Sequence, residues 1–596
     1  MVVENLPLPF AQWIGPAILY FLQAAAGVGL IALVVGYLIA AFRHGPLKAG
    51  DLTFRVVSSS AKQFFQLSPR RVLAMAKLAV QESIRRRVLV AYAVFLLILL
   101  FAGWFLDTTT RDPATLYLSF VLTATTYLVL LMALFLSAFS IPADIKNRTI
   151  YTVVTKPVRP GEIVLGRMLG FSVIGTVLLA IMGLFSYFFV VRVLNHTHEV
   201  ELSSLKSSSG QSVGLQTGQT SLAQNHRHDV TLDSKGNLYV ERSHGHTHPG
   251  AVIESGQTIA SIGPPEGLFR ARVPVYGTLR FKDRSGRDTN KGVSVGSEWG
   301  YRSFIDGGTL AAAIWTFEGI TPERFPDGLP LEMTIRVFRT HKGDVGRGIL
   351  GSIVVKNPKD PKKASRLKTF EAKDADIDPH LIGLKQVDDD GKPLDLFEDL
   401  APDGKLEVWV QCLNTAQYFG AARPDLYIRA HDNSFEMNFL KGYLGIWLQM
   451  LLVTGLGVMF STFLSGAVAM MATITAMVVG FFTSFVIGVA EGEVQGGGPL
   501  ESLIRLVMQQ NVVSEFTEEG LQKNVVQSID AVAMALMKIA AQLLPDFTRF
   551  ANVNYVAHGF DISPDLLLAQ MVTTAAYLLA MFTVGYFFLR TREIAR

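Results

Sequence analysis

The sequence predicts an α-helical polytopic membrane protein into which a β-sandwich-like domain is inserted on the extracytoplasmic side. The composition is 49% hydrophobic and only 17% charged, whereas soluble domains average about 25% charged residues. Several apolar runs without a charge reach the length of about 20 residues that a helix needs to cross a bilayer. Between two groups of these runs, residues 195–440 change to short alternating segments with turn residues, which favour antiparallel strands.

The apolar runs divide the chain into seven parts, and they predict one extra N-terminal helix plus six core spans. The expected parts are an N-terminal transmembrane helix (1–42), a basic cytoplasmic segment (43–87), three spans with a cytoplasmic loop at 142–167 (88–194), the inserted domain (195–440), a transmembrane hairpin (441–490), extracytoplasmic helices (491–562), and a last span with a tail (563–596). The hairpin is expected to turn near residues 461–466, because 49 uncharged residues from 442 to 490 exceed one crossing.

Basic residues set the predicted orientation. Residues 43–87 hold ten Lys or Arg against two acids, and the loop 142–167 is also net basic. Short basic segments beside spans stay in the cytoplasm, so we expect the C-terminus inside and the inserted domain outside. The first apolar run has no basic residue before it, so we interpret it as a retained helix and not as a cleaved signal peptide.

A predicted helix precedes the second span. Residues 72–87 place Val72, Met75, Ala76, Ala79 and Val80 at helical spacing on one face. This face suits a helix that lies in the membrane interface, and a plain cytoplasmic helix remains the alternative.

The loop at 142–167 resembles the first cytoplasmic loop of ABC-2 type permeases, and the tail after the last span does so too. The resemblance covers about residues 70–194 and 440–596, and its nearest group is the permeases associated with multicopper-enzyme maturation. In that family the loop docks on a separate ATPase subunit. The residues that this resemblance assigns to docking are Asp144, Lys146, Arg148, Thr149, Ile150, Lys156, Pro157, Glu162 and Gly166.

The resemblance implies several partners. They are an ABC ATPase that supplies ATP and Mg²⁺, a second permease copy in a homo- or heterodimer, and the lipid bilayer, which we expect to be a bacterial inner membrane. The loop departs from the family where Asp144 follows Pro142 and Ala143, because a Glu is frequent there. An ordinary basic loop of another membrane protein is the alternative interpretation.

The chain lacks the residues for nucleotide hydrolysis. A phosphate-binding loop needs Gly-Lys followed by Ser or Thr, but Gly391-Lys392 precedes Pro393 and Gly404-Lys405 precedes Leu406. We therefore expect no enzyme activity in this chain. The formal net charge of +4 is small for 596 residues and gives no indication of nucleic-acid binding.

The inserted domain begins with a histidine-rich segment at 195–250 and continues as a β-rich part at 251–435. Residues 331–337 and 406–412 alternate like strands, and 230–241 and 278–288 are hairpin-like. Seven of the twelve histidines lie in the first segment. His244, His246 and His248 would share one side of an extended strand and could bind Zn²⁺ or Cu²⁺, while a flexible polar segment is the alternative. The single cysteine, Cys412, excludes a cysteine-based cluster.

Three functions remain open from the sequence. The first is the permease subunit of an ABC exporter or an ABC-driven extracytoplasmic machine. The second is a membrane anchor that presents a β-sandwich to a partner or glycan, and the third is a membrane-bound enzyme in the outer domain. The predicted spans carry no formal charge, which counts against an ion-coupled transporter.

Overall fold

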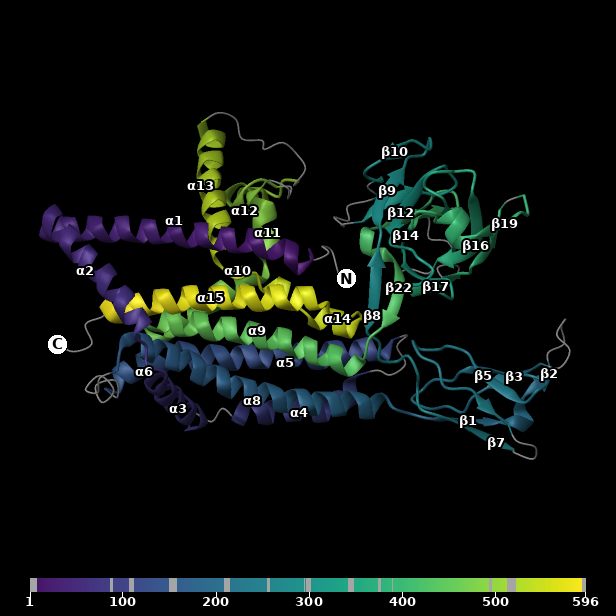
Figure 1. Cartoon of the computed structure of the whole chain (residues 1–596), viewed down its shortest axis with the longest axis horizontal. Helices are drawn as coiled ribbons and strands as arrows, with labels where there is room; N and C mark the ends of the chain where they lie inside the picture. The colour runs from purple at the N-terminus through teal and green to yellow at the C-terminus, as the bar shows by residue number, and fades with distance from the viewer. Residues whose placement is uncertain are drawn as a thin grey trace. The chain divides into compact units, whose positions relative to one another are not determined.

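The computed structural model (Figure 1) resolves into two compact units. A helical unit comprises Pro7–Phe269, Phe439–Ala557 and Ile562–Arg596, and a β unit comprises Arg270–Asn438 with His558–Asp561. Residues of the predicted insertion fall in both units. The structure describes residues 8–85, 89–106, 112–148, 158–207, 215–253, 258–293, 295, 302–340, 348–372, 377–388, 390–491, 496–511 and 521–591.

Long apolar helices dominate the helical unit. Within the described ranges, six are long and apolar enough to cross a membrane: Phe10–His44, Pro113–Lys146, Pro160–Leu194, Phe435–Ser461, Asn524–Ala557 and Pro564–Thr591. They correspond to α1 (Phe10–His44), α5 (Pro113–Ala138) with α6 (Ser140–Lys146), α8 (Pro160–Leu194), α9 (Phe435–Ser461), α13 (Leu521–Leu543) with α14 (Val553–Ala557), and α15 (Pro564–Thr591).

The set of candidate spans differs from the seven expected at residues 88–106, at residues 524–557 and in the second arm of the apolar hairpin. The predicted span at 88–106 is α4 (Leu89–Phe105), which has only 17 residues, or about 26 Å at 1.5 Å per residue. The region 524–557 was expected to hold helices outside the membrane, and by length and composition it is instead a candidate span. Amphipathic and membrane-crossing helices are hard to separate from sequence when a few charged residues, here Asp530 and Lys538, interrupt an apolar run.

The predicted turn of the apolar hairpin is confirmed. Helix α9 ends at Ser461 and α10 (Gly466–Phe481) begins at Gly466. The second arm is not straight, because α10 and α11 (Thr483–Ala490) meet at a bend of 71° next to Phe482. This pair would raise the number of candidate spans to seven if it crosses the bilayer as one broken helix.

Helix α3 (Pro69–Arg85) packs along the N-terminal half of α8. The predicted apolar face is confirmed at Val72, Met75, Ala76 and Ala79, which are buried. Gly166 and Gly170 of α8 allow the close approach, since a Cβ on Gly166 would lie 2.3 Å from the Met75 Cβ. Two small residues four apart are a common device for bringing helix backbones together.

Three sheets build the β unit. The largest runs in the order β10-β9-β12-β20-β15-β16, the next β17-β13-β22-β8, and the smallest β11-β21-β14. The strands are β8 (Arg272–Tyr276), β9 (Thr278–Lys282), β10 (Asp288–Thr289), β11 (Ser303–Asp306), β12 (Ala312–Glu318), β13 (Leu329–Thr334), β14 (Arg336–Arg339), β15 (Ile349–Lys356), β16 (Ala364–Ala372), β17 (Ile377–Ile382), β20 (Lys405–Cys412), β21 (Gln417–Ala421) and β22 (Leu426–Asp432), with a separate pair β18 (Lys385–Val387) and β19 (Pro393–Asp395).

One buried cluster joins these sheets. Trp315 and Val408 contribute to it from the six-stranded sheet, Leu331 from the four-stranded sheet, and Phe419 from the three-stranded sheet. The alternation predicted at 406–412 is confirmed by β20. The run at 331–337 is instead shared by β13 and β14, which belong to different sheets, so its alternation continues across a change of pairing partner.

The remaining strands form a small module, which we define as residues 195–266 and call the histidine module. It contains β1 (His198–Glu201) paired with β7 (Ile259–Ile262), and a five-stranded meander of β2 (Lys206–Ser207), β3 (Gln216–Gln219), β4 (Asp229–Leu232), β5 (Asn237–Val240) and β6 (Ala251–Val252). The hairpin predicted at 230–241 is confirmed by β4 and β5. Val200, Val230 and Leu238 are part of its own small buried core. The polar segment is therefore folded where the structure describes it.

Adding a methyl group at Gly166 should destabilise the helical unit. In Gly166→Ala the new Cβ meets Met75 and the Val72 carbonyl oxygen, and overpacking of this kind costs about 1–3 kcal/mol. Gly36→Ala in α1 is the matched control, because no atom lies within 4 Å of its Cβ position. Thermal unfolding of the full chain in detergent should show a lower midpoint for Gly166→Ala only; equal midpoints would contradict the close packing of α3 on α8.

Candidate metal centre

Six histidines of the histidine module converge in three pairs with one residue between the members. The pairs are His196 with His198, His226 with His228, and His246 with His248. Residues two apart in extended chain point to the same side, so each pair directs both imidazoles inward. The first pair follows α8 directly, the second precedes β4, and the third lies between β5 and β6.

Tight turns position the second and third pairs. Gln224 and Asn225 have φ of 44° and 60°, and His244 and Gly245 have φ of 48° and 82°. Two consecutive residues with positive φ are typical of type I′ hairpin turns, for which Asn and Gly are favoured. In each turn a bridge pairs the flanking residues, Ala223 with His226 and Ser243 with His246. The two turns therefore deliver His226 and His246 in the same way.

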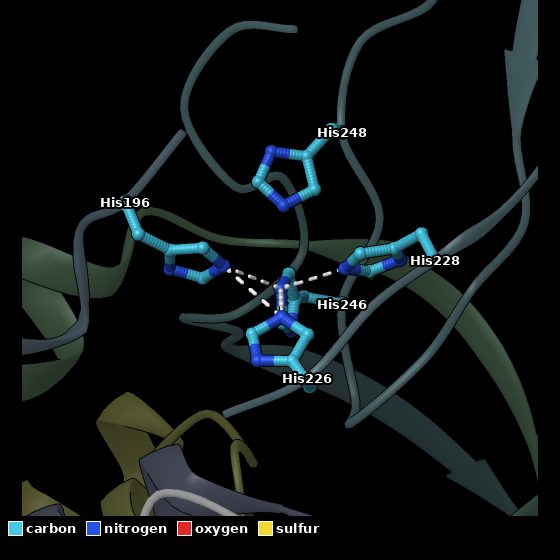
Figure 2. Close-up of side chains that lie close together, drawn as sticks. All are labelled: His196, His226, His228, His246 and His248. Carbon is cyan, nitrogen blue, oxygen red and sulfur yellow. Dashed lines mark hydrogen bonds between the residues drawn. The ribbon is translucent and has the colours of Figure 1, made fainter. Parts of the chain in front are cut away.

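The inner nitrogens of three histidines form a triangle. The Nε2 atoms of His196, His226 and His246 lie 3.2–3.3 Å apart, and His228 Nε2 lies 3.3 Å from His246 Nε2. Candidate ligand atoms of His196, His226, His228, His246 and His248 all lie within 4.8 Å of one another (Figure 2). His196 and His228 face each other across the middle of this view, as do His226 and His248.

Each of the six imidazoles is held at its outer nitrogen by a backbone carbonyl. The Nδ1 atoms lie 2.7–3.3 Å from the carbonyl oxygens of Leu194, Ser221, Gln224, Glu241, His244 and Gly263. A carbonyl oxygen can only accept, so Nδ1 carries the proton and Nε2 presents a lone pair. This is the supporting arrangement that metal-ligating histidines use, since it fixes the tautomer and the ring orientation.

Burial keeps the cluster neutral. His198, His228 and His246 are fully buried, and His226 and His248 are nearly so. Loss of hydration is the main cause that lowers the pKa of His246 to about 2 and the pKa of four others to about 4, namely His196, His226, His228 and His248. The pKa of His198 is lowered for the same reason. Neutral imidazole is the form that binds metal.

Of the three predicted metal ligands, the structure brings His246 and His248 into the cluster and leaves His244 outside the five-residue group. His244 occupies the first central position of its turn, and its Nδ1 lies 2.8 Å from the Ser243 hydroxyl. The other members lie earlier in the sequence, and spacing along a single strand does not indicate that they join this run. Three repeats of His-x-His were the signal in the sequence that could have found them.

At the opposite end of α8, the predicted docking residues lie among buried ion pairs. The Glu162 carboxylate is fully buried and accepts bonds of 2.7–2.8 Å from the Arg71 guanidinium of α3. It also accepts from the backbone N–H groups of Ser68 and Arg159. Glu162 therefore ties the start of α3 to the start of α8.

A buried cation, Arg167, joins three helices. Arg167 of α8 is 2% exposed and donates to Glu82 of α3 and to Asp144 of α6. Asp144 and Glu162, predicted to reach a partner, thus make ion pairs within this chain. Lys146 and Arg148 are exposed, Gly166 is buried against α3, and Thr149, Ile150, Lys156 and Pro157 lie outside the described residues.

Comparison with protein-family models, with curated proteins and with solved structures gives no match for this chain.

Acid should loosen the histidine module before it affects the β unit. The six histidines have folded-state pKa values below the ordinary value of 6.5, so the unfolded module binds more protons. Its stability is complete above pH 6.5 and falls as the pH approaches about 4. Hydrogen exchange of the metal-free full chain, corrected for intrinsic rates, should show protection lost from β4 and β5 between pH 7 and 5.

Strand β15 is the internal reference for that experiment, because it belongs to the β unit and the histidines belong to the helical unit. Unchanged or increased protection of β4 and β5 in acid would contradict a buried neutral cluster.

Removing the Arg167 guanidinium should weaken the junction of α3, α6 and α8. Arg167→Met keeps the side-chain length but removes the buried guanidinium that pairs with Glu82 and Asp144, and breaking a buried charge pair in this way costs about 2–5 kcal/mol. Arg55→Met is the control, because its pair with Asp51 is exposed and such pairs contribute about 0–1 kcal/mol. Detergent unfolding midpoints of the two variants measure the difference, and similar midpoints would be inconsistent with a structural role for Arg167.

Proposed function

We propose that this chain is a membrane protein whose histidine module binds a divalent transition-metal ion. The observation that carries the proposal is the convergence of buried, neutral imidazole Nε2 atoms whose Nδ1 atoms are all fixed by backbone carbonyls. The Nε2 atoms of His198 and His248 are buried without a hydrogen-bond partner. Leaving such acceptors unsatisfied costs about 1–3 kcal/mol each, and a bound cation would remove that cost.

The ligand chemistry defines the class of ion. Imidazole suits Zn, Cu, Fe and Ni, while Ca²⁺ and Mg²⁺ prefer oxygen ligands. The candidate group contains only histidines. Sequence considerations alone suggested Zn²⁺ or Cu²⁺ for this segment, and both belong to the class that the module would accept.

Metal content of the full chain tests this proposal. Protein stripped with a chelator, loaded with a divalent transition metal and freed of excess should retain about one ion per chain. The triple variant His196→Ala/His226→Ala/His246→Ala removes all three corners of the Nε2 triangle. It leaves fewer ligands than a four-coordinate structural site needs, so it should not retain the ion. His431→Ala is the control, because His431 is exposed in β22 of the β unit. Stoichiometric metal in the triple variant, or none in the parent, would refute the proposal.

A second candidate function is favoured by the helical unit. We infer that the chain also serves as the membrane subunit of an ABC transporter, either an exporter or an ABC-driven extracytoplasmic machine. The ion pairs of Arg71 and Arg167 support this, since they fasten α3, α6 and α8 around the loop between α6 and α8. A loop that transmits force from an ATPase needs rigid attachment on both sides.

This second candidate includes the finer predictions about architecture and partners. They are a six-span core with one extra N-terminal helix, a β-sandwich outside the bacterial inner membrane, a cytoplasmic C-terminus, a second permease copy, and an ATPase that binds ATP and Mg²⁺. A membrane anchor that presents the β unit to a partner or glycan is the alternative. The shared core beneath the three sheets supports a sandwich.

Co-purification distinguishes these two possibilities. The tagged chain extracted from its native membrane should retain a polypeptide with a phosphate-binding loop and ATPase activity. Arg148→Glu reverses an exposed charge beside the loop and should reduce the retained ATPase, while Lys359→Glu, 74% exposed in the β unit, should not. Absence of any ATPase from the parent preparation would favour the anchor.

A further inference from the structure

We propose that the metal centre is six-coordinate, with His198 as the sixth ligand, and that it selects a divalent ion that prefers octahedral geometry, from Mn²⁺ to Ni²⁺, over Zn²⁺ and Cu²⁺. The inference rests on the proposed function, because it presumes that a metal binds in the module. It goes further in naming the coordination number, the additional ligand and the class of ion.

The contacts among the six rings have the connectivity of an octahedron. Twelve of the fifteen ring pairs are in edge contact, with centroids 4.8–5.2 Å apart. An octahedron has twelve edges and three opposite pairs of corners. The three pairs of rings outside this set are His196 with His228, His226 with His248, and His198 with His246.

Figure 2 agrees with two of these opposite pairs, since His196 faces His228 and His226 faces His248. The corner opposite His246 belongs to His198. The ring of His198 contacts those of His196, His226, His228 and His248. Its Nδ1 is directed outward to the Ser221 carbonyl oxygen, and its buried Nε2 has no hydrogen-bond partner. The ring of His198 therefore lies at the sixth corner, while the ligand atoms within 4.8 Å of one another are those of the other five histidines.

The size of the octahedron suits a six-coordinate ion. A regular octahedron whose edge equals the Nε2 separations of 3.2–3.3 Å has its centre about 2.3 Å from each corner, the edge divided by √2. Zn²⁺ in proteins has Zn–N distances of about 2.0–2.1 Å and is almost always tetrahedral at structural sites. Dividing the ring-centroid separations by √2 in the same way places the centroids about 3.5 Å from the centre. The Nε2 atoms are nearer to the centre than the centroids of their rings, so each ring points its Nε2 atom inward.

The geometry also opposes Cu²⁺. Copper(II) favours square-planar or tetragonal ligand sets, and raw affinity for nitrogen ligands follows the order Mn²⁺, Fe²⁺, Co²⁺, Ni²⁺, Cu²⁺. Selection within that series must come from geometry. A tetragonal site would require the octahedron to lengthen along one axis, and a square-planar site would require the ion to lose two ligands. Six imidazoles that are held by separate backbone carbonyls resist both changes, because each would leave buried nitrogens without a partner.

Cobalt and manganese are the probes for the test, used on the chelator-stripped full chain. Co²⁺ should give the weak visible absorption of a six-coordinate ion in the parent. Electron paramagnetic resonance should show that the affinity for Mn²⁺ falls at least about 10-fold in His198→Ala. Loss of a residue that only supports a ligand already lowers metal affinity by about that factor. Zn²⁺ binding to the same variant should change much less, because four ligands satisfy zinc.

His244→Ala is the matched control, since His244 belongs to the same segment but its ring contacts that of His226 alone among the six, and its Nδ1 lies 2.8 Å from the Ser243 hydroxyl; it should leave both metals unaffected. Hydrogen exchange of β4 and β5 in His198→Ala reports whether the module still folds. His248→Ala removes a different ligand and repeats the test independently. Intense four-coordinate Co²⁺ absorption in the parent would overturn the inference, as would equal losses of Mn²⁺ and Zn²⁺ in both folded variants. Binding of no metal at all would instead refute the proposed function.

Discussion

The histidine module depends on one repeated interaction, the hydrogen bond from an imidazole Nδ1–H to a backbone carbonyl. Six such bonds turn six Nε2 lone pairs toward one point. Without a cation this arrangement is costly, because burial removes water from acceptors that cannot bond to one another. The core of the module is small, with five buried apolar residues among those the structure describes. Both facts indicate that metal binding would supply a large share of its stability, as it does in other small metal-binding domains.

Helix α8 connects the two polar centres of the helical unit. In its N-terminal turns the buried Glu162 and Arg167 make ion pairs with neighbouring segments, and the carbonyl oxygen of its last residue, Leu194, accepts from His196 Nδ1. The final carbonyls of a helix lack partners inside the helix and carry a partial negative charge. A cation beside His196 would therefore be favourably placed. The helix has 35 residues, about 52 Å at 1.5 Å each, so a single rigid element links the two centres.

Features with a local cause could be predicted from the sequence, and features that depend on long-range pairing could not. The turn after Ser461 and the buried face of Met75 and Ala79 follow from chain length and helical period. The change of sheet between β13 and β14 does not, because alternation persists across it. Likewise the spacing of each His-x-His pair was visible, but not that three pairs from 196 to 248 would meet. His244 shares the spacing yet sits at a turn position with φ of 48°, which no periodicity reveals.

The coordination number of the bound ion tests the central claim most directly. X-ray absorption on the full chain loaded with Co²⁺ or Ni²⁺ reports the number and distance of the nearest atoms and identifies imidazole by its outer-shell scattering. The octahedral cluster predicts six nitrogen neighbours at about 2.1–2.3 Å, all with imidazole scattering. Four neighbours at about 2.0–2.1 Å, or a shell in which oxygen replaces several imidazoles, would contradict it.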